Sequence, residues 1–247
     1  MENLMKLERA KSLSERTFDE LRNAILAMRP GENKLPSEDE LSKALGVSRS
    51  TIREAVKQLQ MDGAITKIQG RGTFAHPSVF QIKNRVDLHP DFYALLSQEH
   101  ERVIMKVEPI GVNTPSGSYM RIFPGAIADE PVYVMVWRYY ADDILMIFGT
   151  FEFPTRLLRS IPSPDFSVQD LPEFGKTYLY DDITYCAMQL RCGFSGIAAK
   201  QFGISETTPV QCWKEVIYDV GDRAVGYCRF FLNPDHMIMS LIAHFGL

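Results

Sequence analysis

Residues 35–55 read LPSEDELSKALGVSRSTIREA, and this stretch predicts the fold of the N-terminal part of the chain. Ser37 followed three positions later by Glu40 is a capping box, which starts a helix. Gly46 ends that helix, because glycine readily adopts the left-handed conformation found after a helix C-terminus. Ser48 then caps another helix. Two short helices joined by a tight turn that contains glycine predict a helix-turn-helix.

The helix that begins at Ser48 has a polar start suited to reading DNA. Arg49 and Arg53 lie four positions apart and so share one helical face, with the hydroxyls of Ser50 and Thr51 between them. A guanidinium can contact guanine O6 and N7 bidentately, while hydroxyls and helix N-terminal amides hold phosphates. The other interpretation is a solvated polar face on an ordinary helix. The opposite side of the helix is apolar, with Ile52, Val56 and Leu59 at helical spacing.

The segments on either side of these helices complete a recognisable arrangement. Upstream, Ser12 and Glu15 form a further capping box, and the helix that follows is expected to end near Pro30 and Gly31. Downstream, residues 65–75 predict a β-hairpin whose tip is rich in glycine and carries an arginine. A hairpin directly after a recognition helix is a wing, although a plain connecting hairpin is the alternative. The tip residues are Gln69, Gly70, Arg71 and Gly72.

Composition is that of a soluble globular protein of one or two domains. The 247 residues carry a net charge of −4, but residues 1–77 alone carry 13 Lys and Arg against 11 Asp and Glu, so the acidic excess lies in the remainder. No apolar run approaches the roughly 20 residues that cross a bilayer, and the first residues lack an apolar signal core. We therefore expect a cytoplasmic protein.

Residues that could support catalysis or metal binding are scattered. The even number of cysteines permits disulfides, but without C-x-x-C spacing we expect reduced, partly buried thiols. No nucleophile–base pair, metal cluster or phosphate loop is recognisable, so we expect no catalytic residue, no metal and no cofactor. The cysteines are Cys186, Cys192, Cys212 and Cys228, and the histidines are His76, His89, His100, His236 and His244.

The C-terminal part of the chain predicts an antiparallel sheet. Residues 92–96 suggest a short helix after a linker, and residues 195–202 a helix closed by Gly203. Strands outnumber helices, and turns such as Asp142-Asp143 join neighbouring strands, which is typical of an α+β domain. Strands are expected over residues 103–107, 117–123, 132–140, 144–153, 184–190, 210–218 and 224–231.

The N-terminal motifs resemble the GntR family of bacterial regulators. Three separated segments occur in the family order: Leu35 to Leu41, Gly46 to Ala55, and Gly70 to Phe74. The resemblance implies a winged helix-turn-helix in which ten residues contact DNA. Many members carry arginine where this chain has Asp39, so its operator preference or affinity is expected to differ. The implied DNA-contacting residues are Ser37, Ser48, Arg49, Ser50, Thr51, Arg53, Gln69, Gly70, Arg71 and Thr73.

Residues 180–240 resemble the end of the UTRA domain of the HutC subfamily. The resemblance implies a domain that binds a small metabolite and forms a homodimer, with Arg138 and Tyr227 near the effector. Two alternatives stay open: Arg138 in a structural ion pair with Asp142, Asp143 or Glu152, and Tyr227 as a core residue. Many relatives have glutamate just before this tyrosine, where this chain has Gly226.

Together these observations predict a ligand-responsive transcription regulator. Residues 1–76 would be the DNA-binding domain, residues 77–90 a linker, and residues 91–247 an effector-binding and dimerisation domain. The homodimer would bind a palindromic operator and act as a repressor. The alternative is a metabolising enzyme that carries a DNA-binding-like head. The sequence leaves the effector, the operator and the choice between repression and activation open.

Overall fold

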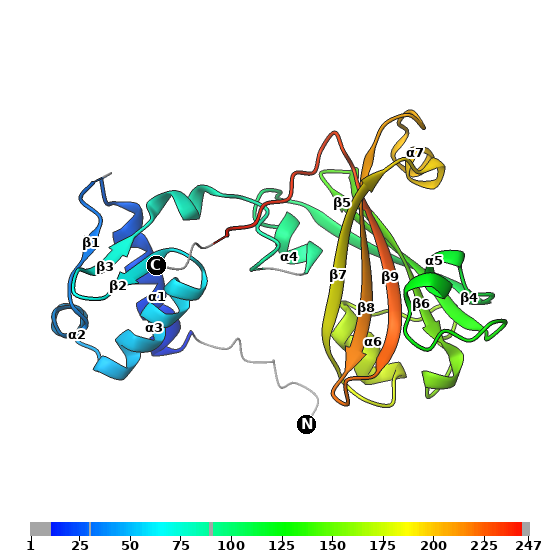
Figure 1. Cartoon of the computed structure of the whole chain (residues 1–247), viewed down its shortest axis with the longest axis horizontal. Coiled ribbons are helices and arrows are strands. Elements are labelled where there is room, and N and C mark those ends of the chain that lie inside the picture. The colour runs from blue at the N-terminus through cyan, green and yellow to red at the C-terminus, as the bar shows by residue number, and fades with distance from the viewer. Residues whose placement is uncertain (1–10, 30, 89–90, 244–247) are drawn as a thin grey trace, which may run out of the picture. The chain divides into compact units, whose positions relative to one another are not determined.

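The computed structural model describes residues 11–29, 31–88 and 91–243, and it forms two compact units (Figure 1). One unit comprises residues up to 90 together with 239–247, and the other comprises Asp91–Ile238. Residues 77–90, which the sequence assigns to a linker, and 239–247, which it assigns to the effector domain, therefore group with the first unit. The predictions that rest on residues 1–10, Pro30, His89, Pro90 and 244–247 lie outside the described residues.

The first unit is a winged helix-turn-helix whose helices begin at the predicted caps. Ser12 and Ser37 each form a complete capping box, and Ser48 accepts a hydrogen bond from the amide of Thr51. Gly46 takes the left-handed conformation, with φ of 65°. The elements are α1 (Leu13–Leu26), β1 (Lys34–Leu35), α2 (Glu38–Leu45), α3 (Arg49–Met61), β2 (Ile65–Ile68), β3 (Gly72–Ala75) and the 3-10 helix η1 (Pro77–Gln81).

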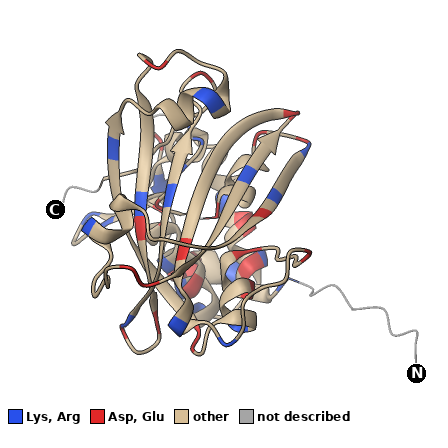
Figure 2. Ribbon diagram, turned by 90° about the vertical axis from the view of Figure 1, so that its right-hand side faces the viewer, with Lys and Arg blue, Asp and Glu red and all other residues tan. Residues whose placement is uncertain are grey.

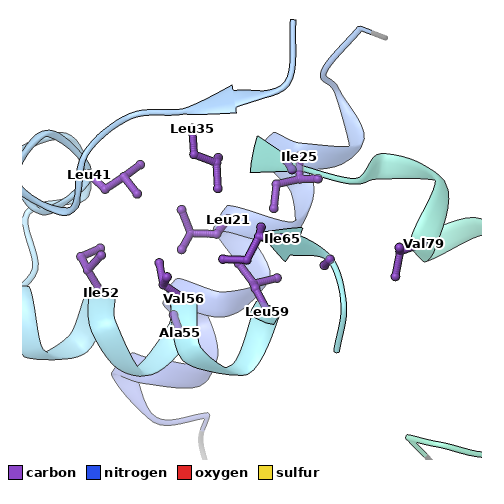
Figure 3. Packing of buried hydrophobic residues seen from close by; sticks show 12 residues of the cluster. Leu21, Ile25, Leu35, Leu41, Ile52, Ala55, Val56, Leu59, Ile65 and Val79 are labelled. Carbon is purple, nitrogen blue, oxygen red and sulfur yellow. The ribbon is translucent and has the colours of Figure 1, made fainter. Parts of the chain in front are cut away.

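One apolar core holds these helices and the wing together (Figure 3). Ile25, Ile52 and Leu59 are completely buried, and the side chains of α1, α3 and β2 point toward one another in the close-up. The wing has three strands in the order β1-β3-β2, of which the sequence predicted two. Leu35 of β1 joins the core, so the short strand fixes the chain that leads into α2. The core thereby orients α3 and the wing together.

A C-terminal segment belongs to this unit as well. The amide of Ser240 donates to Asn84 O at 2.9 Å, and the amide of Val86 donates to Ser240 O at 3.0 Å. Ile242 packs against the apolar core. The last described residues of the chain thus stabilise the segment that follows the wing.

The second unit is built on a six-stranded antiparallel sheet in the order β4-β5-β6-β9-β8-β7. The strands occur where the sequence predicts them, with one exception. Residues 117–123 were predicted as a strand, but the chain forms a helix there, because Ser116 caps it by accepting from the amide of Tyr119. The strands are β4 (Val103–Asn113), β5 (Val132–Ala141), β6 (Ile144–Pro154), β7 (Ile183–Gly193), β8 (Val210–Asp219) and β9 (Ala224–Leu232).

Helices cover both faces of this sheet. On one face, Phe92 of α4 packs on Trp213 and Phe230, and Phe174 of α6 packs on Phe153. The other face is covered at one end by α5 and at the other by α7. The helices are α4 (Phe92–Leu96), α5 (Gly117–Ile122), α6 (Leu171–Tyr178) and α7 (Gly196–Phe202), with the 3-10 helix η2 (Thr155–Leu157) after β6.

Candidate DNA-binding interface and effector site

The N-terminus of α3 presents its polar side chains to solvent. The hydroxyls of Ser50 and Thr51 lie 2.7 and 2.8 Å from Ser48 Oγ. Arg49 and Arg53 are exposed over 62% and 68% of their side chains. Hydroxyls, helix N-terminal amides and two guanidiniums therefore share one accessible surface, which suits contacts with the phosphates and base edges of duplex DNA.

Carboxylates of α2 hold both arginines. Asp39 Oδ1 lies 2.7 Å from Arg49 Nε, and Glu38 Oε2 lies 2.9 Å from Arg53 Nε. Glu38 also contacts Lys67 Nζ at 2.9 Å. The hydrogen bonds from Arg53 and Lys67 lower the pKa of the Glu38 carboxyl. Exposed ion pairs such as these contribute about 0–1 kcal/mol each, so a phosphate or a base edge can replace them.

The wing supplies the second predicted contact region. Gly70 and Gly72 have φ of 74° and 114°, values that residues with a Cβ rarely adopt, and they form the tip around Arg71. Gln69 and Arg71 are exposed, and the Arg71 guanidinium lies 5.9 Å from the ring centroid of Phe74. This arrangement places a cation at the tip of the wing. Because the narrow minor groove of DNA attracts positive charge, the tip is suited to contact it.

Two predicted DNA-contacting residues have visible structural roles. The hydroxyl of Ser37 donates to Glu40 Oε2 at 2.7 Å and accepts from the amide of Glu40, so this residue caps α2. Thr73 is half-buried on β3, between Leu35 and Lys67 of the neighbouring strands. The DNA contacts of all ten residues remain predictions.

The two predicted effector residues lie on the same face of the large sheet. Arg138 contacts Glu108 Oε2 at 2.5 Å and Gln201 Oε1 at 3.3 Å. Its ion-pair partner is thus Glu108, whereas the three carboxylates considered from the sequence bond elsewhere. Asp142 bonds His100, Asp143 bonds Arg102, and Glu152 accepts from Ser116.

Tyr227 is completely buried, and its hydroxyl lies 2.6 Å from Ser118 Oγ. Burial raises the pKa of this tyrosine. Its ring packs edge-to-face with Tyr119 of α5. Tyr227 is therefore a core residue in this structure, and its role toward an effector remains a prediction.

Gly226 has a structural reason in this chain. A Cβ at this position would lie 2.5 Å from Cε1 of Phe153, closer than real Cβ contacts allow. The ring of Phe153 fills the space beside the backbone, so a larger residue at 226 would displace it.

Three cations that sequence reasoning missed gather between the helices of the α5–α7 face. Arg191, Lys214 and Arg229 line a hollow of about 290 Å3 together with residues 193–195. Lys214 and Arg229 are half-buried and lie inside strands otherwise rich in apolar residues. In the sequence, the signal was a cationic side chain inside a stretch that otherwise reads as an apolar strand. Only the pairing of the strands brings these cations together.

All four cysteines are free thiols, as predicted. Cys228 is buried, and Cys186 and Cys212 are half-buried, whereas Cys192 is exposed. The helices in the described part of the chain include none long and apolar enough to cross a membrane.

The helix-turn-helix unit is similar in sequence to known proteins. A sequence model of the family described as "Bacterial regulatory proteins, gntR family" matches residues 13–75. The chain is 41% identical over 63 residues to a histidine utilization repressor from Pseudomonas putida, which covers 24% of this chain and 25% of that protein. It is 27% identical over 129 residues to the uncharacterized regulator YurK of Bacillus subtilis, with 52% of each chain covered. The chain thus matches between a quarter and about half of the length of these relatives.

Solved structures with the same fold are also known. The possible transcriptional regulator YydK from Bacillus subtilis superposes with a TM-score of 0.66 at 17% identity, covering 95% of this chain and all of that one. PhnF from Mycobacterium smegmatis gives a TM-score of 0.50 at 19% identity, covering 92% and 99%. At these identities the similarity establishes the fold, with an N-terminal helix-turn-helix followed by an antiparallel α+β domain.

Proposed function

Because residues 13–75 form a GntR-family helix-turn-helix domain, we propose that this chain is a ligand-responsive transcription regulator that binds operator DNA through α3 and the wing. The observation that carries the proposal is the exposed pair of Arg49 and Arg53 at the N-terminus of α3. One buried core fixes this helix and the Arg71 hairpin, so both can enter adjacent grooves of one duplex.

The second unit is the proposed sensor of a small molecule. Its hollow on the α5–α7 face offers a binding volume, and Arg138 lies in the same cross-strand row as Phe231 and Cys212 of that hollow. A ligand can change operator occupancy only if it binds two arrangements of the protein with unequal affinity. We propose repression by occlusion of the promoter, in the cytoplasm, as the form of regulation.

A second copy of the chain is the proposed partner. β7 ends the sheet, so within the described residues one edge of this 11-residue strand has no pairing strand. Met188 and Leu190 are exposed on it, at 42% and 49%. A long exposed edge with apolar side chains invites pairing with another chain. Covering it with the same strand of a second copy would give a two-fold dimer suited to a palindrome.

The alternative of a metabolising enzyme has less support. The family model and the named curated relatives are those of regulators. Regulation also accounts for the exposed guanidiniums of α3, for which catalysis offers no role.

The test uses fluorescence anisotropy to measure how tightly the chain binds the DNA upstream of its own gene. We expect Arg49→Ala to cost about 1–3 kcal/mol of operator affinity and to relax base preference, since a bidentate base contact is lost. Lys176→Ala removes one positive charge from an exposed position of α6 and serves as the matched control. If Arg49→Ala keeps the affinity and the footprint of the wild type, Arg49 does not contact a base as proposed.

A further inference from the structure

The hollow on the α5–α7 face has a cationic floor and rim. Lys214 of β8 and Arg229 of β9 are paired directly across their strands. Arg191 of β7 lies opposite Cys212, which also lines the hollow. Side chains that are directly opposite in an antiparallel pair point to the same face of the sheet, so the three cations converge from three neighbouring strands. Figure 2 shows basic residues on neighbouring strands of this sheet.

Carboxylates do not neutralise these cations. Among the residues that the structure describes, no Asp or Glu lies within ion-pair distance of Arg191, Lys214 or Arg229. Other arginines of this unit are paired: Arg138 with Glu108, and Arg156 with Glu130 at 2.7 Å. Positive charges that share one hollow repel one another, so binding an anion between them would be favourable.

The charged form of Lys214 is disfavoured at its position. Burial lowers the pKa of its ammonium group, and the nearby guanidiniums of Arg191, Arg121 and Arg229 lower it further. An anion bound among these groups would raise the pKa of Lys214, because it would offset the positive charges of the neighbouring guanidiniums.

Two buried polar atoms in the same row as Lys214 find no hydrogen-bond partner among the residues that the structure describes. They are Arg229 Nε and Thr150 Oγ1. Thr150 of β6 lies directly opposite Arg229, so both atoms belong to one row of the sheet. The ring of Phe231, 5.1 Å from the Arg229 guanidinium, compensates for part of the lost solvation. A buried donor left without an acceptor is costly, and it is uncommon unless a ligand or water supplies one.

We propose that this hollow binds a small organic anion carrying a phosphate or several carboxylates, with Arg191, Lys214 and Arg229 as its charged contacts. The proposal rests on the effector-sensing function proposed above and names its ligand class. Guanidiniums hold such groups through paired N–H···O bonds, and the Lys214 ammonium adds a point charge. Phe194, Val210 and Phe231, which also line the hollow, would contact the apolar part of the molecule. Arg138, already paired with Glu108, is less available to the anion than the sequence suggested.

The experiment measures the Tm of the full chain in inorganic phosphate and in malonate, each against NaCl at equal ionic strength. We expect one of the two anions to raise Tm by roughly 2–4 °C or more beyond NaCl. Phosphate acting alone indicates a phosphate ester, and malonate acting alone indicates a carboxylate. Isothermal titration then gives Kd for the active anion. We expect Lys214→Gln and Arg191→Gln each to weaken it about fivefold or more, because each loses a charged contact.

The controls separate this inference from the proposed function. Lys106→Gln removes a cation from β4, at the opposite edge of the sheet, and should leave Kd unchanged. Arg191 is exposed, so its variant is expected to fold even if changes at Arg229 impair folding. No stabilisation beyond NaCl, or equal Kd values in all variants, overturns the anion site. Operator binding is measured on the same preparations. If the protein binds the operator but no anion, only the anion site is wrong. If it binds the anion but not the operator, the proposed regulator function is wrong.

Discussion

Asp39 Oδ1 lies 2.7 Å from Arg49 Nε, so the second residue of α2 holds the first residue of α3 across the helix-turn-helix. The family resemblance described above implies an arginine, rather than an acid, at the position of Asp39. Here the acid occupies the predicted DNA surface and engages the arginine most suited to reading a base. We therefore expect this ion pair to weaken DNA binding, because Arg49 must leave Asp39 before it can contact a base.

Asp39→Asn is expected to tighten operator binding about threefold to tenfold at low salt, since it removes a negative charge beside the phosphates and releases Arg49. Fluorescence anisotropy across a salt series measures the effect, which should shrink as salt rises. Asp165→Asn makes the same change in net charge on an exposed loop of the second unit and should have no effect. Equal affinities for wild type and Asp39→Asn at low salt would show that the Asp39–Arg49 ion pair does not weaken operator binding.

Leu190→Lys is expected to shift the full chain from dimer to monomer, because it places a charge on the free edge strand β7. Light scattering after size exclusion reports the mass directly. Val112→Lys is the matched control, since Val112 is exposed at 51% on β4, the opposite edge of the sheet. A dimer that survives Leu190→Lys but dissociates in the control would place the interface on β4.

Glu215 is expected to make the stability of the second unit depend on pH. Burial raises the pKa of its carboxyl above the ordinary 4.5, while hydrogen bonds from the Cys228 and Cys186 thiols oppose the shift. The Cys228 thiol lies 3.2 Å from Glu215 Oε2, and burial raises the pKa of Cys186 to about 12, so both neighbours stay neutral near pH 8.

The direction follows from which state ionises first. As pH rises above 4.5, the unfolded chain loses the Glu215 proton while the folded chain retains it, so stability falls. Thermal unfolding from pH 5 to pH 8 should therefore show a smaller decline for Glu215→Gln than for wild type. Glu206→Gln, at an exposed position, should follow wild type. Parallel curves for wild type and Glu215→Gln would contradict this assignment.

Gly226→Ala is expected to destabilise the protein by about 1–3 kcal/mol, because its Cβ would overlap the ring of Phe153. Urea unfolding measures the change. Gly193→Ala introduces the same methyl group where nothing lies within 4 Å, and its cost should be much smaller. Equal costs at the two positions would mean that the Phe153 ring moves aside freely.

Ending the chain at Ile238 is expected to speed amide exchange at Val86 at least tenfold, because the acceptor Ser240 O is lost. Hydrogen exchange with site resolution tests this. The amide of Ala75, which donates to Asn33 O at 2.7 Å within the same unit, should keep its protection. If both amides accelerate equally, the C-terminal segment stabilises the whole unit rather than only residues 84–86, with which it pairs.

Local signals gave much of the fold in advance. Each cap at Ser12, Ser37 and Ser48 acts within three residues, and Gly46 was expected to take a left-handed conformation from its own lack of a Cβ. Asp170 caps α6 by accepting a hydrogen bond from the amide of Glu173. This cap is a similar local signal, but no helix was predicted from it. The strand predicted at residues 117–123 failed for a different reason: Ser116 caps a helix there while Glu152, 36 residues away, anchors Ser116.

The sequence by itself determined the winged helix-turn-helix and the antiparallel character of the second unit, because caps, glycines and apolar periodicity operate over a few neighbouring residues. Only the tertiary structure decided that Asp39 restrains Arg49, that Glu108 pairs with Arg138, and that Lys214 meets Arg229. These relationships depend on strand register and on the docking of one element against another. Both are set by the packing of the whole core, so no short stretch of sequence encodes them.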